Sequence, residues 1–224
     1  TYFGTLSSSR NNITWVEGTP LPAPKYGLKM VTLHDGIVLV TGGVTATGQG
    51  REVILGNVSG NTITWANTSN NFLPSPLYFH ESTILPDGRV FVSGGLDTNS
   101  LDTVYFGRVI NANVTWTTGT PMPTPRHSHA QSVMVDGRIF ISGGINNLLT
   151  GLGHDVLTGT FPPNGSRIRW RYETPLPVFK YFHKSATIPN NRIIIQGGLD
   201  NEACTAMTVS TEVYAVLPSV GIKL

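Results

Sequence analysis

Hydrophobic and polar positions follow one pattern that recurs four times along the chain. In each copy a short apolar stretch is followed by a polar turn, a second apolar stretch and a pair of glycines. The second stretches (IVLV, RVFV, RIFI and RIII) are nearly continuous in β-branched residues, as in strands buried on both faces. The copies span Leu28 to Gly43, His80 to Gly95, His129 to Gly144 and His183 to Gly198.

The turn between the two apolar stretches predicts a β-hairpin in every copy. It is Asp-Gly at 35–36, 87–88 and 136–137 and Asn-Asn at 190–191, pairs of residues that tolerate a positive φ. A third strand follows each glycine pair (REVILG, DTVYFG, HDVLTG and STEVYAV), and a fourth carries a tryptophan (NTITW, ANVTW and RIRW). No segment shows sustained helical periodicity. The pattern therefore predicts four antiparallel strands in each unit.

Two unrelated markers share one period of about 50 residues. The first glycine of each pair stands at 42, 94, 143 and 197. The only four tryptophans, Trp15, Trp65, Trp116 and Trp170, repeat with nearly the same spacing. Thr-Pro-x-Pro follows three of them, at 19–22, 120–123 and 174–177, and we align LPSP at 73–76 with these segments. Internal repeats of this length are typical of propellers.

The repeat resembles the kelch family. The matching features are the apolar strand that ends in Gly-Gly, the DG hairpin, an aromatic residue on strand three (Tyr105, Tyr214), the strand-four tryptophan and the P-x-P segment. The resemblance implies an all-β fold, a β-propeller built from four-stranded antiparallel kelch blades. Three departures are the non-aromatic strand HDVLTG, the last unit without a tryptophan, and Leu28 where the other units have histidine.

We predict a single kelch propeller domain over residues 1–224. Its units run from 1 to 24 (partial), 25–76, 77–125, 126–179 and 180–224, which is about four and a half repeats. Both ends of the chain supply a third strand. If the two ends simply share one blade, that blade has one strand too many. Either a small ring closes with an extra strand, or the chain is part of a larger ring. We favour the second interpretation.

The composition gives no indication of a nucleic-acid or membrane partner. Net charge is +2 with no basic run, which gives no reason to expect a nucleic-acid partner. No apolar run approaches the ~20 residues that cross a bilayer, so we expect no membrane insertion. Cys204 is the only cysteine, which excludes a disulfide within the chain.

Strand alternation places the loops after Gly-Gly and the P-x-P loops on one face. Aromatic and basic residues recur sixteen and seventeen positions before the glycine pairs, next to these loops. Aromatic and arginine side chains are typical anchors of recognition surfaces. The candidate binding residues are therefore Tyr26, Tyr78, Arg126, His127 and Tyr181. The alternative is that these positions pack one blade against the next.

The histidines and the single cysteine do not favour catalysis. His80, His129 and His183 share one repeat position, but equivalent positions in neighbouring blades are too far apart for ~2.1 Å bonds to one ion. We expect them to bond the backbone of the adjacent blade, and we predict no metal and no cofactor. Related oxidases of the galactose-oxidase kind need copper and a Cys–Tyr crosslink, and nothing near Cys204 resembles that site.

Five N-glycosylation sequons begin at Asn12, Asn57, Asn67, Asn113 and Asn164. All except Asn67 fall in the predicted turn between strands three and four, on the face opposite the candidate binding residues. Asparagine also favours turns for conformational reasons. With low charge and one cysteine, the sequons indicate a glycoprotein that is secreted or passes through the secretory pathway.

Three functions follow from these patterns. The first is a non-catalytic recognition or assembly module that binds a protein or glycan partner outside the cell. The second is a secreted carbohydrate-active enzyme of the galactose-oxidase or sugar-isomerase kind. The third is a subunit of an extracellular polymer that self-assembles through an open blade edge.

Overall fold

The computed structural model describes residues 1–9, 11–66, 71–147, 152–200 and 211–215. These residues form antiparallel β-sheets without an α-helix, as the sequence predicts, and the one helical turn is the 3₁₀ segment η1 (Leu152–His154). No helix in the described ranges has the length and apolar character needed to span a membrane. Asn67 and Cys204 lie outside the described residues.

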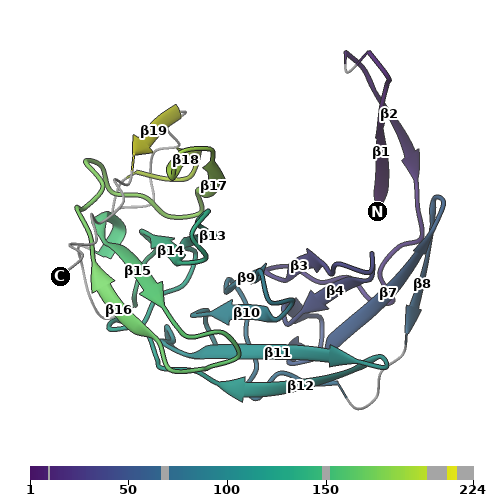
Figure 1. The fold of residues 1–224 in the computed structure, drawn as a ribbon. Coiled ribbons are helices and arrows are strands. Elements are labelled where there is room, and N and C mark those ends of the chain that lie inside the picture. The colour runs from purple at the N-terminus through teal and green to yellow at the C-terminus, as the bar shows by residue number, and fades with distance from the viewer. Residues whose placement is uncertain (10, 67–70, 148–151, 201–210, 216–224) are drawn as a thin grey trace. The chain divides into compact units, whose positions relative to one another are not determined.

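Three sheets have four strands each, in the predicted order (Figure 1). The first contains β3 (Lys29–Thr32), β4 (Val38–Thr41), β7 (Val53–Ser59) and β8 (Thr62–Ala66). The second contains β9 (Glu81–Ile84), β10 (Val90–Ser93), β11 (Val104–Ile110) and β12 (Asn113–Thr118). The third contains β13 (Ala130–Val133), β14 (Ile139–Ser142), β15 (Val156–Thr160) and β16 (Arg169–Tyr172). The all-β, repeated-sheet architecture is thus confirmed, and its closure into a propeller stays a prediction.

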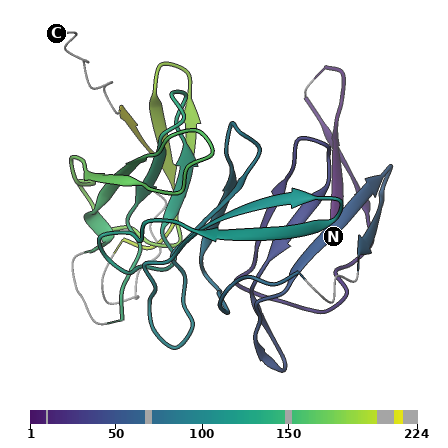
Figure 2. The ribbon, with the colours of Figure 1, turned by 60° about the horizontal axis from the view of Figure 1, so that its bottom comes forward.

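Smaller sheets stand at both ends of the chain. β1 (Tyr2–Leu6) pairs with β2 (Ile13–Glu17), and β17 (Lys184–Ile188), β18 (Arg192–Gln196) and β19 (Thr211–Ala215) form a three-stranded sheet. A short ribbon of β5 (Val44–Thr45) and β6 (Gly48–Gln49) follows the first glycine pair. Contacts divide the chain into two compact units, Thr1–Tyr78 with Val109–Thr115 and Phe79–Arg108 with Trp116–Leu224, and each is described by itself. The tip of the β11–β12 hairpin, teal in Figure 2, is therefore counted with the first unit.

The predicted hairpins form at the Asp-Gly and Asn-Asn pairs. Gly88 has a φ of 81°, and the amide of Leu85 donates to the carbonyl of Arg89 across the turn at 2.8 Å. Asn190 and Asn191 reach the same left-handed region, with φ of 67° and 53°. The second strand of each complete sheet is buried at every residue, in agreement with its unbroken apolar run.

The four tryptophans occupy equivalent places on β2, β8, β12 and β16, as predicted. A glycine on the third strand faces each of them, and the pairs are Gly4–Trp15, Gly56–Trp65, Gly107–Trp116 and Gly159–Trp170. A Cβ at Gly159 would lie 2.7 Å from the indole of Trp170. The glycine is therefore part of the repeat, because the indole covers the strand at that point.

The P-x-P segments tie successive repeats together within each unit. Thr19 Oγ1 accepts from the amide of Ile63 at 3.0 Å, and Trp65 Nε1 donates to the Pro20 carbonyl at 2.7 Å. In the second unit Thr120 Oγ1 accepts from the amide of Ile168 at 2.9 Å, as Thr19 does from Ile63, and Trp170 Nε1 donates to the carbonyl of Thr120 itself at 3.2 Å.

Asn71 takes the place of this threonine in the remaining described repeat. Its Oδ1 accepts from the amide of Val114 at 2.9 Å and its Nδ2 donates to the Ala112 carbonyl at 2.8 Å. The counterpart of Thr-Pro-x-Pro is therefore Asn-Phe-Leu-Pro at 71–74, and the alignment to LPSP at 73–76 was wrong by two residues.

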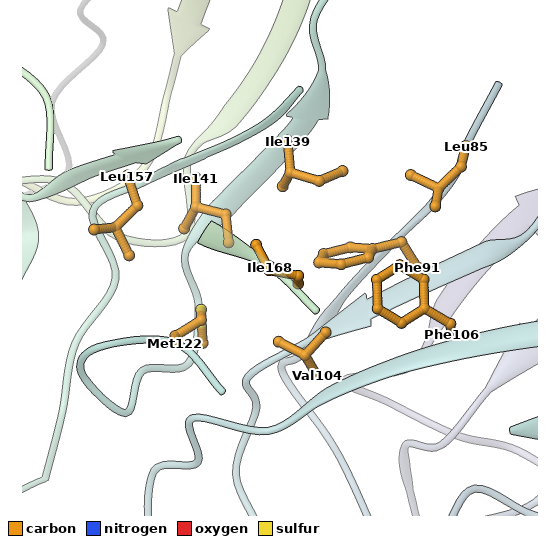
Figure 3. Packing of buried hydrophobic residues seen from close by; sticks show 9 residues of the cluster. All are labelled: Leu85, Phe91, Val104, Phe106, Met122, Ile139, Ile141, Leu157 and Ile168. Carbon is orange, nitrogen blue, oxygen red and sulfur yellow. The ribbon is translucent and has the colours of Figure 1, made fainter. Parts of the chain in front are cut away.

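A core of nine buried apolar residues lies in the second unit (Figure 3). Phe91 and Phe106 pack edge to face, with ring centroids 5.3 Å apart, and Phe161 stacks on Phe91. A second cluster lies on the other face of β14, because Phe140 points away from Ile139 and Ile141. Alternate residues of one buried strand thus contribute to two separate cores.

Candidate functional site

The P-x-P loops and the loops after Gly-Gly lie side by side, as strand alternation predicts. In three repeats the residue that ends the P-x-P loop pairs with the first residue after Gly-Gly, through two backbone hydrogen bonds of 2.8–3.1 Å. The three pairs are Tyr26 with Val44, His127 with Ile145 and Tyr181 with Leu199. We call the surface formed by these paired loops the loop face of each unit.

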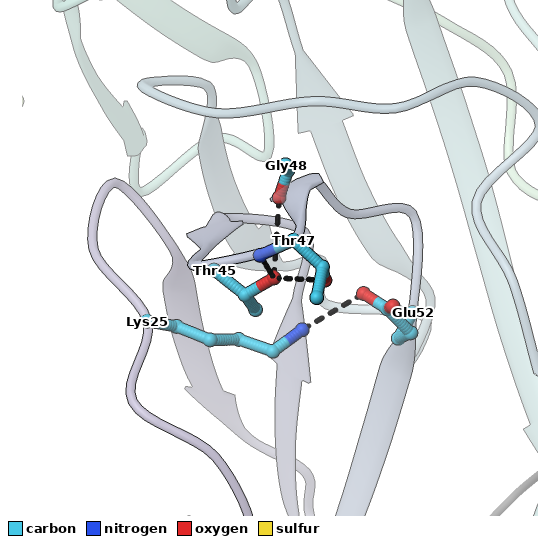
Figure 4. A network of polar contacts seen from close by, with 5 residues as sticks. All are labelled: Lys25, Thr45, Thr47, Gly48 and Glu52. Carbon is cyan, nitrogen blue, oxygen red and sulfur yellow. Dashed lines mark hydrogen bonds and ion pairs between the residues drawn. The ribbon is translucent and has the colours of Figure 1, made fainter.

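The loop face of the first unit borders a pocket of about 630 Å³. Its walls come from the P-x-P loop at 22–25, the β5–β6 turn and the outer strands β7 and β8, including Trp65. Thr45 Oγ1 is the centre of the polar edge in Figure 4, where it lies 2.9 Å from Thr47 Oγ1 and donates to the Gly48 carbonyl at 3.3 Å.

An ion pair closes one side of this pocket. Lys25 Nζ lies 2.8 Å from Glu52 Oε2, and the lysine side chain is only 4% exposed whereas that of Glu52 is 48% exposed (Figure 4). The hydrogen bond from Lys25 holds the pKa of Glu52 below its usual value. The exposed carboxylate is therefore charged at neutral pH and accessible to a ligand.

Three left-handed residues organise the loop face of the second unit. Phe79, Ser128 and Phe182 directly precede the recurring histidine and have φ of 54°, 56° and 55°. The amide of Ser128 donates to the Phe79 carbonyl at 2.9 Å, and the amide of Phe182 donates to the Ser128 carbonyl at 2.8 Å. Bulky residues seldom adopt this conformation, and such strain persists only where the surroundings hold it. In the first unit the same position is Gly27, with φ of 65°.

These residues bring aromatic side chains together. The ring of Phe79 packs edge to face on Phe182 at 5.3 Å between centroids and lies at 6.4 Å from the His127 imidazole, nearly parallel to it. Tyr181 adds a further contact with Phe182, at 5.4 Å. Phe182 remains 47% exposed, so the cluster presents one aromatic side chain to solvent.

His127 connects the cluster to the loops after Gly-Gly. Its Nδ1 lies 2.9 Å from Ser100 Oγ, which also donates to Asn147 Oδ1 at 3.2 Å. Burial lowers the pKa of His127 to about 4, so its imidazole is neutral at physiological pH. The arrangement fixes two loops, and in the part of the chain that the structure describes no carboxylate bonds Ser100 or His127 as a hydrolytic triad requires.

The predicted binding residues differ widely in exposure. In the first unit Tyr26 is 59% exposed and Tyr78 is half-buried. In the second unit Arg126, His127 and Tyr181 are all buried, and the last two belong to the aromatic cluster. Their role in binding stays a prediction, and the exposed aromatic next to them is Phe182.

Arg126 is held by groups of its own repeat and of the P-x-P loop that precedes it. Its guanidinium donates to the Gly143 carbonyl at 2.9 Å and to Thr124 Oγ1 at 2.7 Å, and it lies 3.3 Å from Asp155 Oδ2. Lys25 with Glu52 is the same pair in the first unit. At two of the basic positions that the sequence indicated as anchors, Lys25 and Arg126, a buried cation is therefore paired with a partly exposed carboxylate.

Two of the three recurring histidines bond a serine side chain, and the expected bonds to the backbone stay a prediction. His129 Nε2 lies 2.9 Å from Ser93 Oγ, and His183 Nε2 lies 2.9 Å from Ser142 Oγ. Each serine directly precedes the glycine pair of the preceding repeat. Within the described ranges no group of three His, Cys, Asp or Glu side chains could hold a metal ion.

The four described sequon asparagines, Asn12, Asn57, Asn113 and Asn164, are all exposed. Asn57 lies within β7 and Asn113 begins β12, so these two are in strand extensions and not in the turn itself. Asn164 has a φ of 58°, and its Oδ1 accepts from Arg108 at 2.8 Å.

Phe79, Phe182 and Ser100 were not predicted from sequence. Phe79 and Phe182 follow Tyr78 and Tyr181 directly, at the position of Gly27. A glycine aligned with two phenylalanines is a usable signal, because it indicates a left-handed residue in every repeat. Ser100 carries no such signal, since its loop differs from the corresponding loops in length.

Neither a protein-family model nor a curated protein matches this chain.

Proposed function

We propose that the chain is a kelch-type propeller segment that acts as a non-catalytic recognition module. It binds a protein or glycan partner through the loop face, outside the cell. The observation that carries the proposal is the exposed ring of Phe182, which is fixed on Phe79 by two backbone hydrogen bonds between left-handed residues. A rigid aromatic anchor loses little conformational entropy on binding.

Backbone strain supports a role beyond packing. Non-glycine residues in left-handed conformations cost on the order of 1–3 kcal/mol each and cluster where a loop is held for a purpose. Glycine at Phe79 or Phe182 would remove that cost, as Gly27 does in the first unit. The presence of phenylalanine and not glycine at both positions therefore indicates that the aromatic rings have a function.

The test compares Phe182→Gly with Ser128→Gly. Both variants place glycine at the same repeat position, but only the first removes an aromatic ring from the surface. The variants and the unchanged protein are immobilised and exposed to an array of defined oligosaccharides and to extracellular proteins of the source organism. A ligand that is lost with Phe182→Gly and retained with Ser128→Gly supports the proposal. Equal binding by both variants would overturn it.

We further propose that Asn12, Asn57, Asn113 and Asn164 carry glycans. All four are exposed, and their place near the turn between strands three and four puts them opposite the loop face. Glycans there would leave the loop face open to a partner. Peptide mapping of protein from its natural source tests this point, and four unmodified asparagines would contradict both the glycoprotein and the extracellular assignment.

A further inference from the structure

Three arginines stand at alternate positions along the outer edge of the third sheet. Arg169 and Arg171 belong to β16, the last strand of that sheet, and Arg167 shortly precedes it. Between them, Ile168 is buried in the core shared with the second sheet and Trp170 packs against that core. Successive residues of a strand point to opposite faces, so the three arginines lie on the face turned away from this core. All three are exposed, and we call them the arginine stripe.

The arginine stripe is a departure from the repeat. Its residues stand three positions before, one position before and one position after the strand-four tryptophan. The other three tryptophan-bearing repeats have uncharged residues at all of these positions, namely Asn12, Thr14 and Val16, then Thr62, Thr64 and Ala66, and then Asn113, Thr115 and Thr117. The fold of the repeat therefore does not require arginine at any of the three.

The exposure of the stripe is a property of its place in the repeat. In the second sheet the same positions are held by Asn113, Thr115 and Thr117, which are exposed as well. A complete four-stranded sheet follows the second sheet along the chain. A following sheet thus leaves these positions open to solvent, and the three arginines stand where the repeat exposes its side chains.

The charges of the stripe are poorly compensated. Among the described residues, neither Arg167 nor Arg169 forms an ion pair, and Arg171 Nε lies 3.7 Å from Glu173 Oε1. By contrast, an aspartate lies at 2.7–3.3 Å from each of three other arginines of the same unit, Arg89, Arg126 and Arg138. Three like charges on alternate residues repel one another, because their Cα atoms are only about 6.6 Å apart. A negatively charged partner would remove this repulsion.

We propose that the arginine stripe binds an extended acidic segment of a partner protein, with aspartate or glutamate at alternate positions. Alternate residues of an extended peptide are also about 6.6 Å apart, so three carboxylates can face the three guanidinium groups in register along about 13 Å. The planar guanidinium group matches the geometry of a carboxylate and can donate two parallel hydrogen bonds to it. The proposal does not depend on recognition through the loop face.

Two peptides of equal composition test the spacing. The sequences TETETET and TTEEETT carry the same charge, but only the first has its carboxylates at alternate positions. Both are blocked at their termini, labelled with a fluorophore and titrated with the whole chain at low ionic strength, with anisotropy as the measurement. We expect TETETET to bind at least about threefold more tightly, and its affinity to fall as salt is added. Equal affinities, or no binding of TETETET, would overturn the proposal.

The variant Arg169→Thr tests the site, because it restores the threonine that the other three repeats have at this position. It should fold normally by circular dichroism and lower the affinity for TETETET at least about threefold. Arg192→Thr is the matched control, since it removes an exposed arginine from β18 in the same unit. It should leave the affinity nearly unchanged, and an equal loss in both variants would show that only net charge matters.

A competing polysaccharide tests the class of partner. Oligogalacturonate carries carboxylates on sugar rings and lacks the repeat of an extended peptide. It should displace TETETET less effectively than unlabelled TETETET does at the same concentration of carboxylate. More effective displacement by the oligogalacturonate would assign the stripe to an acidic polysaccharide and overturn the proposal of a protein segment.

Discussion

Ser142 Oγ lies 2.9 Å from Nε2 of His183, although the two residues belong to successive repeats. Both side chains are fully buried. A Cβ at Gly143 would lie 2.8 Å from Cε1 of His183, so the first glycine of the pair provides the space for the imidazole. The recurring Ser-Gly-Gly and the recurring histidine are therefore two halves of one contact between neighbouring sheets.

This contact predicts a pH-dependent stability. Burial, together with Lys180 and Lys184, lowers the pKa of His183 to about 3, and burial lowers that of His127 to about 4. The unfolded chain, with an ordinary histidine pKa near 6.5, then binds more protons than the folded protein between these values. Stability is complete above about pH 6.5 and decreases as the pH falls toward 3–4.

Urea denaturation between pH 7 and 5 measures the effect. Each buried histidine contributes a slope of at most about 1.4 kcal/mol per pH unit in this window. His183→Gln, which keeps a group able to reach Ser142, should reduce the slope. A pH dependence that this variant leaves unchanged would show that His183 is not the titrating group.

Ser128 allows a direct measurement of the strain on the loop face. Its φ is 56° and its buried hydroxyl has no hydrogen-bond partner among the described residues. Ser128→Gly should raise the free energy of unfolding by about 1 kcal/mol, because glycine adopts this conformation without steric cost. Ser128→Ala removes the same hydroxyl but keeps the strain, so it should gain less. Equal stabilisation by the two variants would assign the effect to the hydroxyl alone.

Asn71 should be replaceable by threonine but not by alanine. The side chain is 2% exposed and bonds both Val114 and Ala112. Asn71→Ala leaves these backbone groups without a partner and should cost about 1–3 kcal/mol in thermal or urea unfolding. Asn71→Thr supplies the acceptor that Thr19 and Thr120 supply in their repeats, and should recover part of that loss. A threonine variant as unstable as the alanine variant would contradict the equivalence of the three positions.

Repetition explains why so much of the fold follows from the sequence. The Gly-Gly strand ends, the DG turns and the four tryptophans each recur, so an error at one copy is corrected by the others. Asn71 was missed because it shares a hydrogen-bonding role with Thr19 and not a residue type. Phe79 and Phe182 were missed for a related reason, since a left-handed φ leaves no mark on a phenylalanine itself.

The role of the basic residues could not be predicted from the sequence, because it depends on partners that are distant along the chain. Lys25 and Arg126 suit a recognition surface by residue type, yet their carboxylate partners stand 27 and 29 residues further along the chain. Only the folded repeat brings Glu52 and Asp155 to them. The second repeat has Leu77 and Thr103 at the same two positions, so in these three repeats the two residues are either both charged or both uncharged.

This pairing predicts strong coupling between Arg126 and Asp155. The guanidinium is fully buried, and burial lowers its pKa while Asp155 opposes that effect. Asp155→Thr alone leaves a buried charge with only carbonyl and hydroxyl acceptors, and Arg126→Leu alone leaves the Gly143 carbonyl without its donor. Breaking one side of a buried pair typically costs about 3–5 kcal/mol.

The double variant Arg126→Leu/Asp155→Thr reproduces the second repeat and should cost less than the sum of the two single changes. We expect a coupling free energy of about 1–3 kcal/mol from a double-mutant cycle in urea. Lys25→Leu/Glu52→Thr in the first unit is the comparison, and its coupling should be smaller because Glu52 is largely exposed and solvent screens the pair. Additivity within about 0.5 kcal/mol at Arg126 and Asp155 would show that the two residues do not act as a pair. Arg126 would then be held by Gly143 and Thr124 alone.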